Sequence, residues 1–208
     1  VQSVNQGGNE GGGIYFGHGT LVLNNNLINN NTAADGAGIR TYHADVLADG
    51  NNISDNYSYG EAGGWSNNGY ENDTLKISNH VFSENFAQTS GGGGLALGSS
   101  TFIMDNSHIL NNTGTFGGGI YVKSGKNTFN NVLISNNHST TRSGGGIHLY
   151  NGTVTINNSK ITNNKSASET GGYYSAVGAS YTTFKNVIIA NNEGNGFEGS
   201  GTLENMSI

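Results

Sequence analysis

The stretch VTINNSKITNN, residues 154–164, places asparagine on both sides of an apolar residue in a strand-like sequence. One asparagine lies three residues before Ile161 and another lies three residues after it, although asparagine favours neither strands nor helices. The same arrangement recurs at steps that average 27 residues. The positions equivalent to Ile161 are Leu27, Ile53, Phe82, Ile109, Ile134 and Ile189. A fixed period of this length indicates a repeat protein.

Asparagine occupies thirteen of the fourteen flanking positions in these seven repeats. The positions after the apolar residue are Asn30, Asn56, Asn85, Asn112, Asn137, Asn164 and Asn192. The positions before it are Asn24, Gly50, Asn79, Asn106, Asn131, Asn158 and Asn186. Asparagine tolerates the left-handed conformation of sharp bends, and its amide can donate and accept hydrogen bonds along a stack. Both sets are therefore predicted to form structural ladders at the corners of stacked coils.

A glycine-led motif keeps the same period. Its copies include GGGIYFG (11–17), GAGIRTY (36–42), GGGIYVK (117–123) and GGGIHLY (144–150). Glycine permits the positive φ of a third corner, and the strand after it alternates, with Ile147 and Leu149 inward and His148 outward. Three short strands cannot bury their own apolar side chains, but stacked coils can. We predict an all-β fold, a parallel β-helix of seven to eight coils.

Composition excludes several classes of protein. The net charge is −6 with only eight Lys and Arg residues, so the chain lacks the clustered basic residues that nucleic acid requires. It has no cysteine, which removes disulfides, zinc–thiolate sites and thiol catalysis. No apolar run reaches the length of a membrane span. We therefore expect neither a nucleic-acid partner nor a membrane span in this chain.

The pairing of GG(G/A)I with a hydrophobic-x-x-Asn motif resembles the GGAI and FxxN repeats in the passenger regions of polymorphic outer-membrane proteins. FSEN, residues 82–85, matches FxxN literally, and the other copies begin with Ile or Leu. Pectin-lyase-like adhesins carry similar coils. The resemblance implies a right-handed parallel β-helix in a secreted, extracellular or cell-surface protein. It implies no specific activity.

The repeats run through nearly the whole sequence, so residues 1–208 are predicted to form a single β-helix domain. Asn205 and Ile208 take the places of Asn186 and Ile189 in a shortened final coil. Strand-rich ends invite further pairing. We expect this domain to be a segment of a longer surface protein, with end-to-end self-association of the coils as the alternative.

Candidate ligand-binding residues lie in long corners and on outward strand positions. The longest corner, residues 57–74, contains Tyr57, Tyr59, Trp65 and Tyr70. Aromatic rings beside amides and carboxylates suit a sugar, although Trp65 could instead replace Ile39 in the core. The outward row of the glycine-led strands contains Tyr15, Arg40, Ala96, Tyr121 and His148. Tyr15, Tyr121 and His148 are the binding candidates in this row.

Resemblance to polysaccharide lyases on this fold, which place a basic residue beside acidic ones, makes Arg40, His43 and Asp45 the weak catalytic candidates. No catalytic set is identified from the sequence itself. His18 and His43 are expected to stack one coil apart, but two histidines without a third ligand do not make a metal site. No metal or cofactor is predicted, and calcium is left open without a supporting motif.

Three function classes follow. We favour a non-enzymatic scaffold or adhesin-like protein that binds carbohydrate or another cell-surface ligand. The second class is a polysaccharide lyase or glycoside hydrolase, which needs Arg40, His43 and Asp45 to converge. The third is a self-assembling fibre subunit or an ice-binding module. Threonines at strand starts suggest the ice-binding reading, but their sequence offsets drift: Thr20, Thr74, Thr101 and Thr153.

Overall fold

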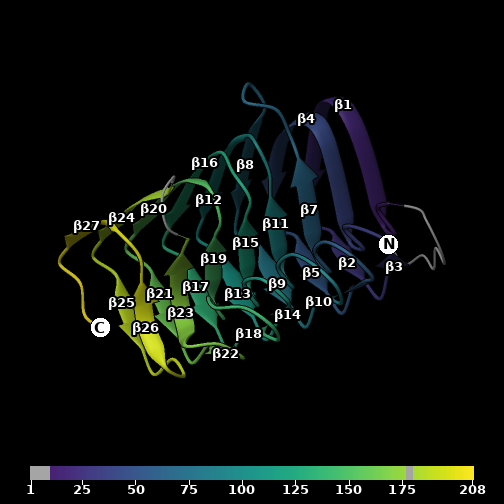
Figure 1. The fold of residues 1–208 in the computed structure, drawn as a ribbon. Coiled ribbons are helices and arrows are strands. Elements are labelled where there is room, and N and C mark those ends of the chain that lie inside the picture. Colours follow the sequence, from purple (N-terminus) through teal and green to yellow (C-terminus); the bar gives the residue numbers. More distant parts are fainter. Residues whose placement is uncertain (1–9, 177–179) are drawn as a thin grey trace.

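The computed structural model describes residues 10–176 and 180–208; the rest of the predicted 1–208 domain lies outside the described residues. The described residues form 27 strands and no helix, stacked along one axis from the N- to the C-terminus (Figure 1). Neighbouring strands pair in parallel, one coil apart. The predicted parallel β-helix is confirmed.

The described strands form three sheets. Two long strands, β1 (Ile14–Asn24) and β4 (Ile39–Asp49), pair along their length and belong to two faces of the largest sheet. The groove face continues from the first half of β4 through β7 (Trp65–Asn68), β11 (Leu95–Leu97), β15 (Ile120–Val122), β19 (Ile147–Leu149), β23 (Thr170–Ser175) and β26 (Asn195–Glu198). The long face continues from its second half through β8 (Thr74–Ser78), β12 (Thr101–Asp105), β16 (Lys126–Asn130), β20 (Gly152–Asn157), β24 (Ser180–Lys185) and β27 (Gly201–Glu204).

Two smaller sheets complete each coil. One contains β2 (Leu27–Asn29), β5 (Asn52–Ser54), β9 (Val81–Ser83), β13 (His108–Leu110), β17 (Leu133–Ser135), β21 (Lys160–Thr162) and β25 (Ile188–Ala190). The other contains β3 (Thr32–Ala33), β6 (Tyr57–Ser58), β10 (Phe86–Ala87), β14 (Thr113–Gly114), β18 (His138–Ser139) and β22 (Lys165–Ser166). The described part of the chain contains no helix long and apolar enough to cross a membrane.

The core is a stack of inward side chains, to which a strand contributes one or two residues. On the groove face, Ile120 pairs with Ile147, both fully buried, and Leu149 is buried beside Val122, as alternation predicts. Because each coil alone would leave these side chains exposed, burial between coils supplies the hydrophobic stabilisation.

A buried asparagine ladder forms one corner of the coils, and the prediction for it needs one correction. In the first coil, Ile28 rather than Leu27 pairs with Ile53, so Asn31 rather than Asn30 begins the ladder. The runs of asparagine around residue 27 leave the register ambiguous by one position. Burial decides it, because a slip of one residue would turn the apolar side chain outward.

Each ladder asparagine donates from Nδ2 to Oδ1 of the asparagine one coil later, at 2.8–3.0 Å. The sequence separations of these pairs are 25, 29, 27, 25, 27 and 28 residues. The described ladder contains Asn31, Asn56, Asn85, Asn112, Asn137, Asn164 and Asn192. It therefore joins seven coils.

The second predicted set is not a buried ladder. Its members are left-handed corner residues exposed to solvent, and the first is Asn25 (φ 55°) rather than Asn24. Asn79, Asn106, Asn131, Asn158 and Asn186 follow with φ between 49° and 57°. Some are still joined through their amides, as in the 2.8 Å bond from Asn131 to Asn106. These asparagines recur because each corner needs the left-handed backbone conformation, which asparagine tolerates without a hydrogen-bond partner.

A mixed row one residue further along fills the buried side of this corner. His80 lies in it, 1% exposed, with Nδ1 donating to the Ser78 carbonyl and Nε2 accepting from Asn51 Nδ2. In the neutral imidazole, both ring nitrogens therefore have a hydrogen-bond partner. Burial lowers the pKa of His80 below its ordinary value.

We expect the protein to lose stability as the pH falls below about 6.5, the ordinary pKa of histidine. The unfolded chain binds a proton at His80 before the folded chain does, because the pKa of His80 is lowered on folding. Urea midpoints measured between neutral and mildly acidic pH test this. His80→Gln should reduce the dependence without abolishing it, because burial also lowers the pKa of His148, whereas His108→Gln, at an exposed position, should leave it unchanged. Equal slopes for the wild type and His80→Gln would contradict the assignment.

The final coil follows the predicted register. Ser207 bridges Ile188 in parallel, and Asn205, at φ 51°, donates to Asn186 Oδ1 at 3.1 Å. Ile208 therefore follows the position of Ile189, and the coil is shortened as expected.

Candidate binding groove

The outer surface of the groove face is hollowed over its C-terminal coils, and we call the whole outer surface of this face the groove. Its floor is the outward row of the strands, in which Tyr121 pairs with His148 and His148 with Tyr174. The full row is Tyr15, Arg40, Ser66, Ala96, Tyr121, His148, Tyr174 and Glu198. Glycine-led bends before the strands form one wall, and the residues that follow the strands form the other.

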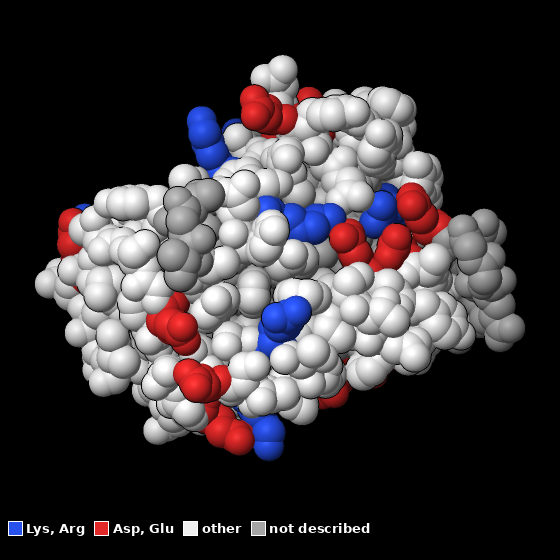
Figure 2. Space-filling model, viewed as in Figure 1, with Lys and Arg blue, Asp and Glu red and all other residues white. Residues whose placement is uncertain are grey.

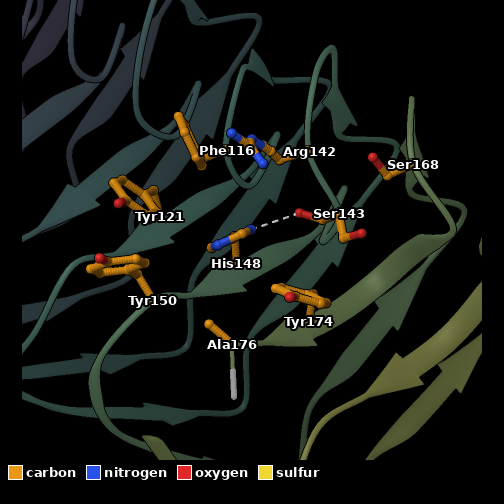
Figure 3. A pocket seen from close by; sticks show the side chains of 9 residues that line it. All are labelled: Phe116, Tyr121, Arg142, Ser143, His148, Tyr150, Ser168, Tyr174 and Ala176. Carbon is orange, nitrogen blue, oxygen red and sulfur yellow. Dashed lines mark hydrogen bonds between the residues drawn. The ribbon is translucent and has the colours of Figure 1, made fainter. Parts of the chain in front are cut away.

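The C-terminal half of the groove contains a hollow of about 550 Å³ (Figure 3). Its lining consists of Phe116, Tyr121, Arg142, Ser143, His148, Tyr150, Ser168, Tyr174 and Ala176. The volume lies in the range of small-molecule sites in proteins. Five of the nine residues are aromatic or histidine rings, and the tyrosine and serine hydroxyls can bond a polar ligand.

The rings of the hollow hold one another in place. The ring centroid of His148 lies 5.6 Å from that of Tyr121 and 4.9 Å from that of Tyr174. Phe116, from the preceding bend, stacks on Tyr121 at 5.2 Å. These contacts preorganise the ring faces before a ligand arrives.

His148 is a neutral base in this environment. It is 5% exposed, and Nδ1 donates to the Ser143 carbonyl at 2.9 Å. Nε2 is therefore the basic nitrogen of the ring. Burial lowers the pKa of His148, and the positive charge of Arg142 lowers it further.

Arg142 is the only charged side chain among the described residues that line the hollow. Its guanidinium carbon lies 5.5 Å from the centre of the Phe116 ring, which fixes the cation over an aromatic face (Figure 3). Arg142 is exposed at the edge of the hollow, so it can reach a ligand. Since no Asp or Glu lines the described hollow, it does not supply the carboxylate pair of a glycoside hydrolase.

The N-terminal half of the groove is filled by an ion network instead. Arg40, with its side chain 6% exposed, lies 3.4–3.8 Å from Glu10, Asp35 and Glu61. Lys123 donates to Glu61 at 2.7 Å. Figure 2 shows charged side chains of both signs side by side over this half of the face. The pairs neutralise the buried charge of Arg40, which would otherwise be costly.

The three catalytic candidates do not converge. Arg40 belongs to the ion network, whereas Asp45 accepts from the Thr74 backbone N–H beyond the bend at His43, which has φ 50°. His43 stacks on His18, with ring centroids 5.3 Å apart and planes 3° apart, as expected. The described residues contain no group of His, Cys, Asp and Glu side chains that could hold a metal ion.

The aromatic residues of the 57–74 corner do not form one surface. Trp65 is 1% exposed and pairs with Ile39 in the core, so it offers no ring face to a ligand. Tyr57 stacks on Phe86 at 5.2 Å and contacts Tyr59 in a smaller sheet.

Tyr70 lies on a different side of the coil, against Tyr42 and His43. Tyr15 is 54% exposed at the first coil and lines no part of the hollow. Of the candidate ligand-binding residues, only Tyr121 and His148 line the hollow together.

The threonines at strand starts share a register that their sequence offsets conceal. Thr101 pairs with Thr74 on one side and with Lys126 on the other, and Lys126 pairs with Thr153. Asp45 lies between Thr20 and Thr74 in the same row. The drift in sequence offsets is therefore not a drift in register, but Asp45 and Lys126 interrupt the row of threonines.

Sequence reasoning missed Phe116, Arg142, Tyr150 and Tyr174. Tyr174 could have been found, because GGYYS (171–175) aligns with GGIHL (145–149) and places Tyr174 beside His148. Phe116 and Arg142 lie in irregular bends, where periodicity does not predict the direction of a side chain.

A parallel β-solenoid with a groove on one outer face defines this protein as a β-helix repeat protein. The family model described as the right handed beta helix region matches residues 8–192, so the chain belongs to the right-handed β-helix family. No curated protein and no solved structure was found to match the chain.

Proposed function

We propose that this protein is a non-catalytic, extracellular or cell-surface β-helix that binds carbohydrate in the hollow of the groove. The observation that carries this proposal is the in-register row of Tyr121, His148 and Tyr174, whose rings face one hollow with Tyr150 (Figure 3). A pyranose ring presents C–H groups on its faces and hydroxyls at its edge. It therefore suits a site that combines aromatic faces with hydroxyl and guanidinium donors.

Binding should depend on the residues of the hollow. Against a panel of neutral and acidic polysaccharides, Tyr174→Ala is expected to weaken the affinity for the retained saccharide by about fivefold, since one stacked ring contributes on the order of 1 kcal/mol. Arg142→Gln should weaken binding of acidic members most. Calorimetric titration with oligosaccharides measures both effects.

Tyr181→Ala is the matched control, because Tyr181 is 55% exposed on the long face, where its hydroxyl contacts Thr202. Unchanged affinity in Tyr174→Ala, or an equal loss in Tyr181→Ala, would contradict the proposal.

A second candidate function is elimination from an acidic polysaccharide, favoured by the arrangement of His148 and Arg142. Arg142 would pair with the carboxylate of the sugar, and His148 Nε2 would take the proton beside it. The electron pair would then form a carbon–carbon double bond as the glycosidic oxygen leaves and takes a proton from water. New reducing ends and ultraviolet absorbance of the unsaturated product, both lost in His148→Gln, would establish this activity; their absence leaves binding as the function.

A further inference from the structure

One ion pair crosses the groove directly beside the hollow. Lys123 follows β15 on one wall, and Glu61 precedes β7 on the other wall, two coils earlier. Lys123 Nζ donates to Glu61 Oε2 at 2.7 Å and also to Asn68. Ala96 lies on the strand of the coil between them, and it is 0% exposed although it points outward, so other side chains cover it.

The surrounding network holds this ion pair in place. Glu61 Oε2 also accepts from Ser66 Oγ at 3.3 Å and lies 3.7 Å from Arg40 Nη1. The Lys123 and Glu61 side chains are only 21% and 24% exposed. A pair shielded in this way is screened less by salt than one at the open surface, and its members are held by several partners.

The Lys123–Glu61 ion pair lies next to the Tyr121 end of the hollow. Tyr121, which lines the hollow, pairs with Ala96 under the ion pair. Burial raises the pKa of Tyr121, and the negative charge of Glu61 raises it further, which places that carboxylate within electrostatic reach of the hollow. In the other direction, the floor continues past Tyr174 to Glu198, which is exposed.

We infer that the Lys123–Glu61 ion pair closes one side of the hollow, so that the site takes the end of a saccharide chain rather than its interior. This inference rests on the proposed function. A chain lying along the coils can extend from Tyr121 toward Tyr174, but its first sugar meets the ion pair. The Lys123–Glu61 pair therefore determines which part of a polysaccharide is recognised.

The wild-type protein tests the inference without any variant. The saccharide that binds in the panel is partly depolymerised. Calorimetry then measures the binding capacity, which is the amount of protein bound by a constant mass of saccharide. For end recognition, the capacity should rise in proportion to the number of chain ends. Chemical reduction blocks the reducing ends, and chemical capping blocks the opposite ends. One of these two treatments should abolish binding, and it identifies the end that the site recognises. Capacity that is independent of chain length would overturn the inference while leaving the proposed function intact.

Lys123→Ala provides the second test, because it opens the groove above Ala96. Its capacity should become independent of chain length, with thermal melting used to verify folding. Lys126→Ala removes the same charge from an exposed position on the long face and should behave as the wild type. Persistent end dependence in folded Lys123→Ala would overturn the inference. Absence of binding to every panel member would overturn both it and the proposed function.

Discussion

Replacing Asn137 with leucine is expected to lower the free energy of unfolding by about 3–5 kcal/mol, as read from urea denaturation. Asn137 Nδ2 donates to Asn164 Oδ1 and to the Ile109 carbonyl. Its Oδ1 accepts from both the backbone N–H and the side-chain amide of Asn112. Leucine has a similar volume but leaves several of these groups buried without partners, and each costs about 1–3 kcal/mol.

Lys160→Ala is the control for this prediction, because Lys160 is exposed on β21 of the next coil. Its effect should stay within about 0.5 kcal/mol, as for most surface substitutions. Similar denaturation midpoints for the two variants would show that Asn137 is not a member of a buried ladder.

Trp65→Ala is expected to lower the free energy of unfolding by about 3–5 kcal/mol. The indole is 1% exposed, between Ile39 and Leu95 in neighbouring coils. Its Nε1 donates to Thr41 Oγ1 at 3.0 Å, and Thr41 donates in turn to Asn67. Truncation to alanine opens a cavity in a stack that cannot collapse, since the coils are fixed by their backbone hydrogen bonds.

Trp65→Phe separates the hydrogen bond from most of the packing, because it retains a buried six-membered ring and loses the indole N–H with a small part of the ring volume. We expect a loss of about 1–2 kcal/mol, from the hydrogen bond and a small cavity. Neither substitution should change saccharide affinity in the folded protein. A loss of affinity with unchanged stability would mean that Trp65 contacts a ligand after all.

Local patterns predicted the architecture because they repeat. The alternation of Ile147, His148 and Leu149 indicated which side chains face the core, and stacking in register confirmed it. The pattern failed by one residue at Leu27, where neighbouring asparagines offered two registers. It also did not distinguish a buried asparagine such as Asn137 from an exposed corner asparagine such as Asn131, because both conformations tolerate the same residue.

The candidate site was only half predictable. The alternation identifies Tyr121 and His148 as outward neighbours, but it does not tell whether an outward side chain is exposed to solvent. His148 is instead 5% exposed, because bends of irregular sequence cover it. The burial of Arg40 was likewise not predictable, since the carboxylates that surround it come from bends in three different coils.

The sequence by itself determined the coil, its period and its inward side chains, since these depend on contacts that recur between equivalent positions. Only the tertiary structure decided the groove. Phe116 and Arg142 reach His148 through bends, and Lys123 reaches Glu61 across two coils. Such contacts join positions that are not equivalent in the repeat, so the period of the sequence does not predict them. The path of each bend determines which side chains meet.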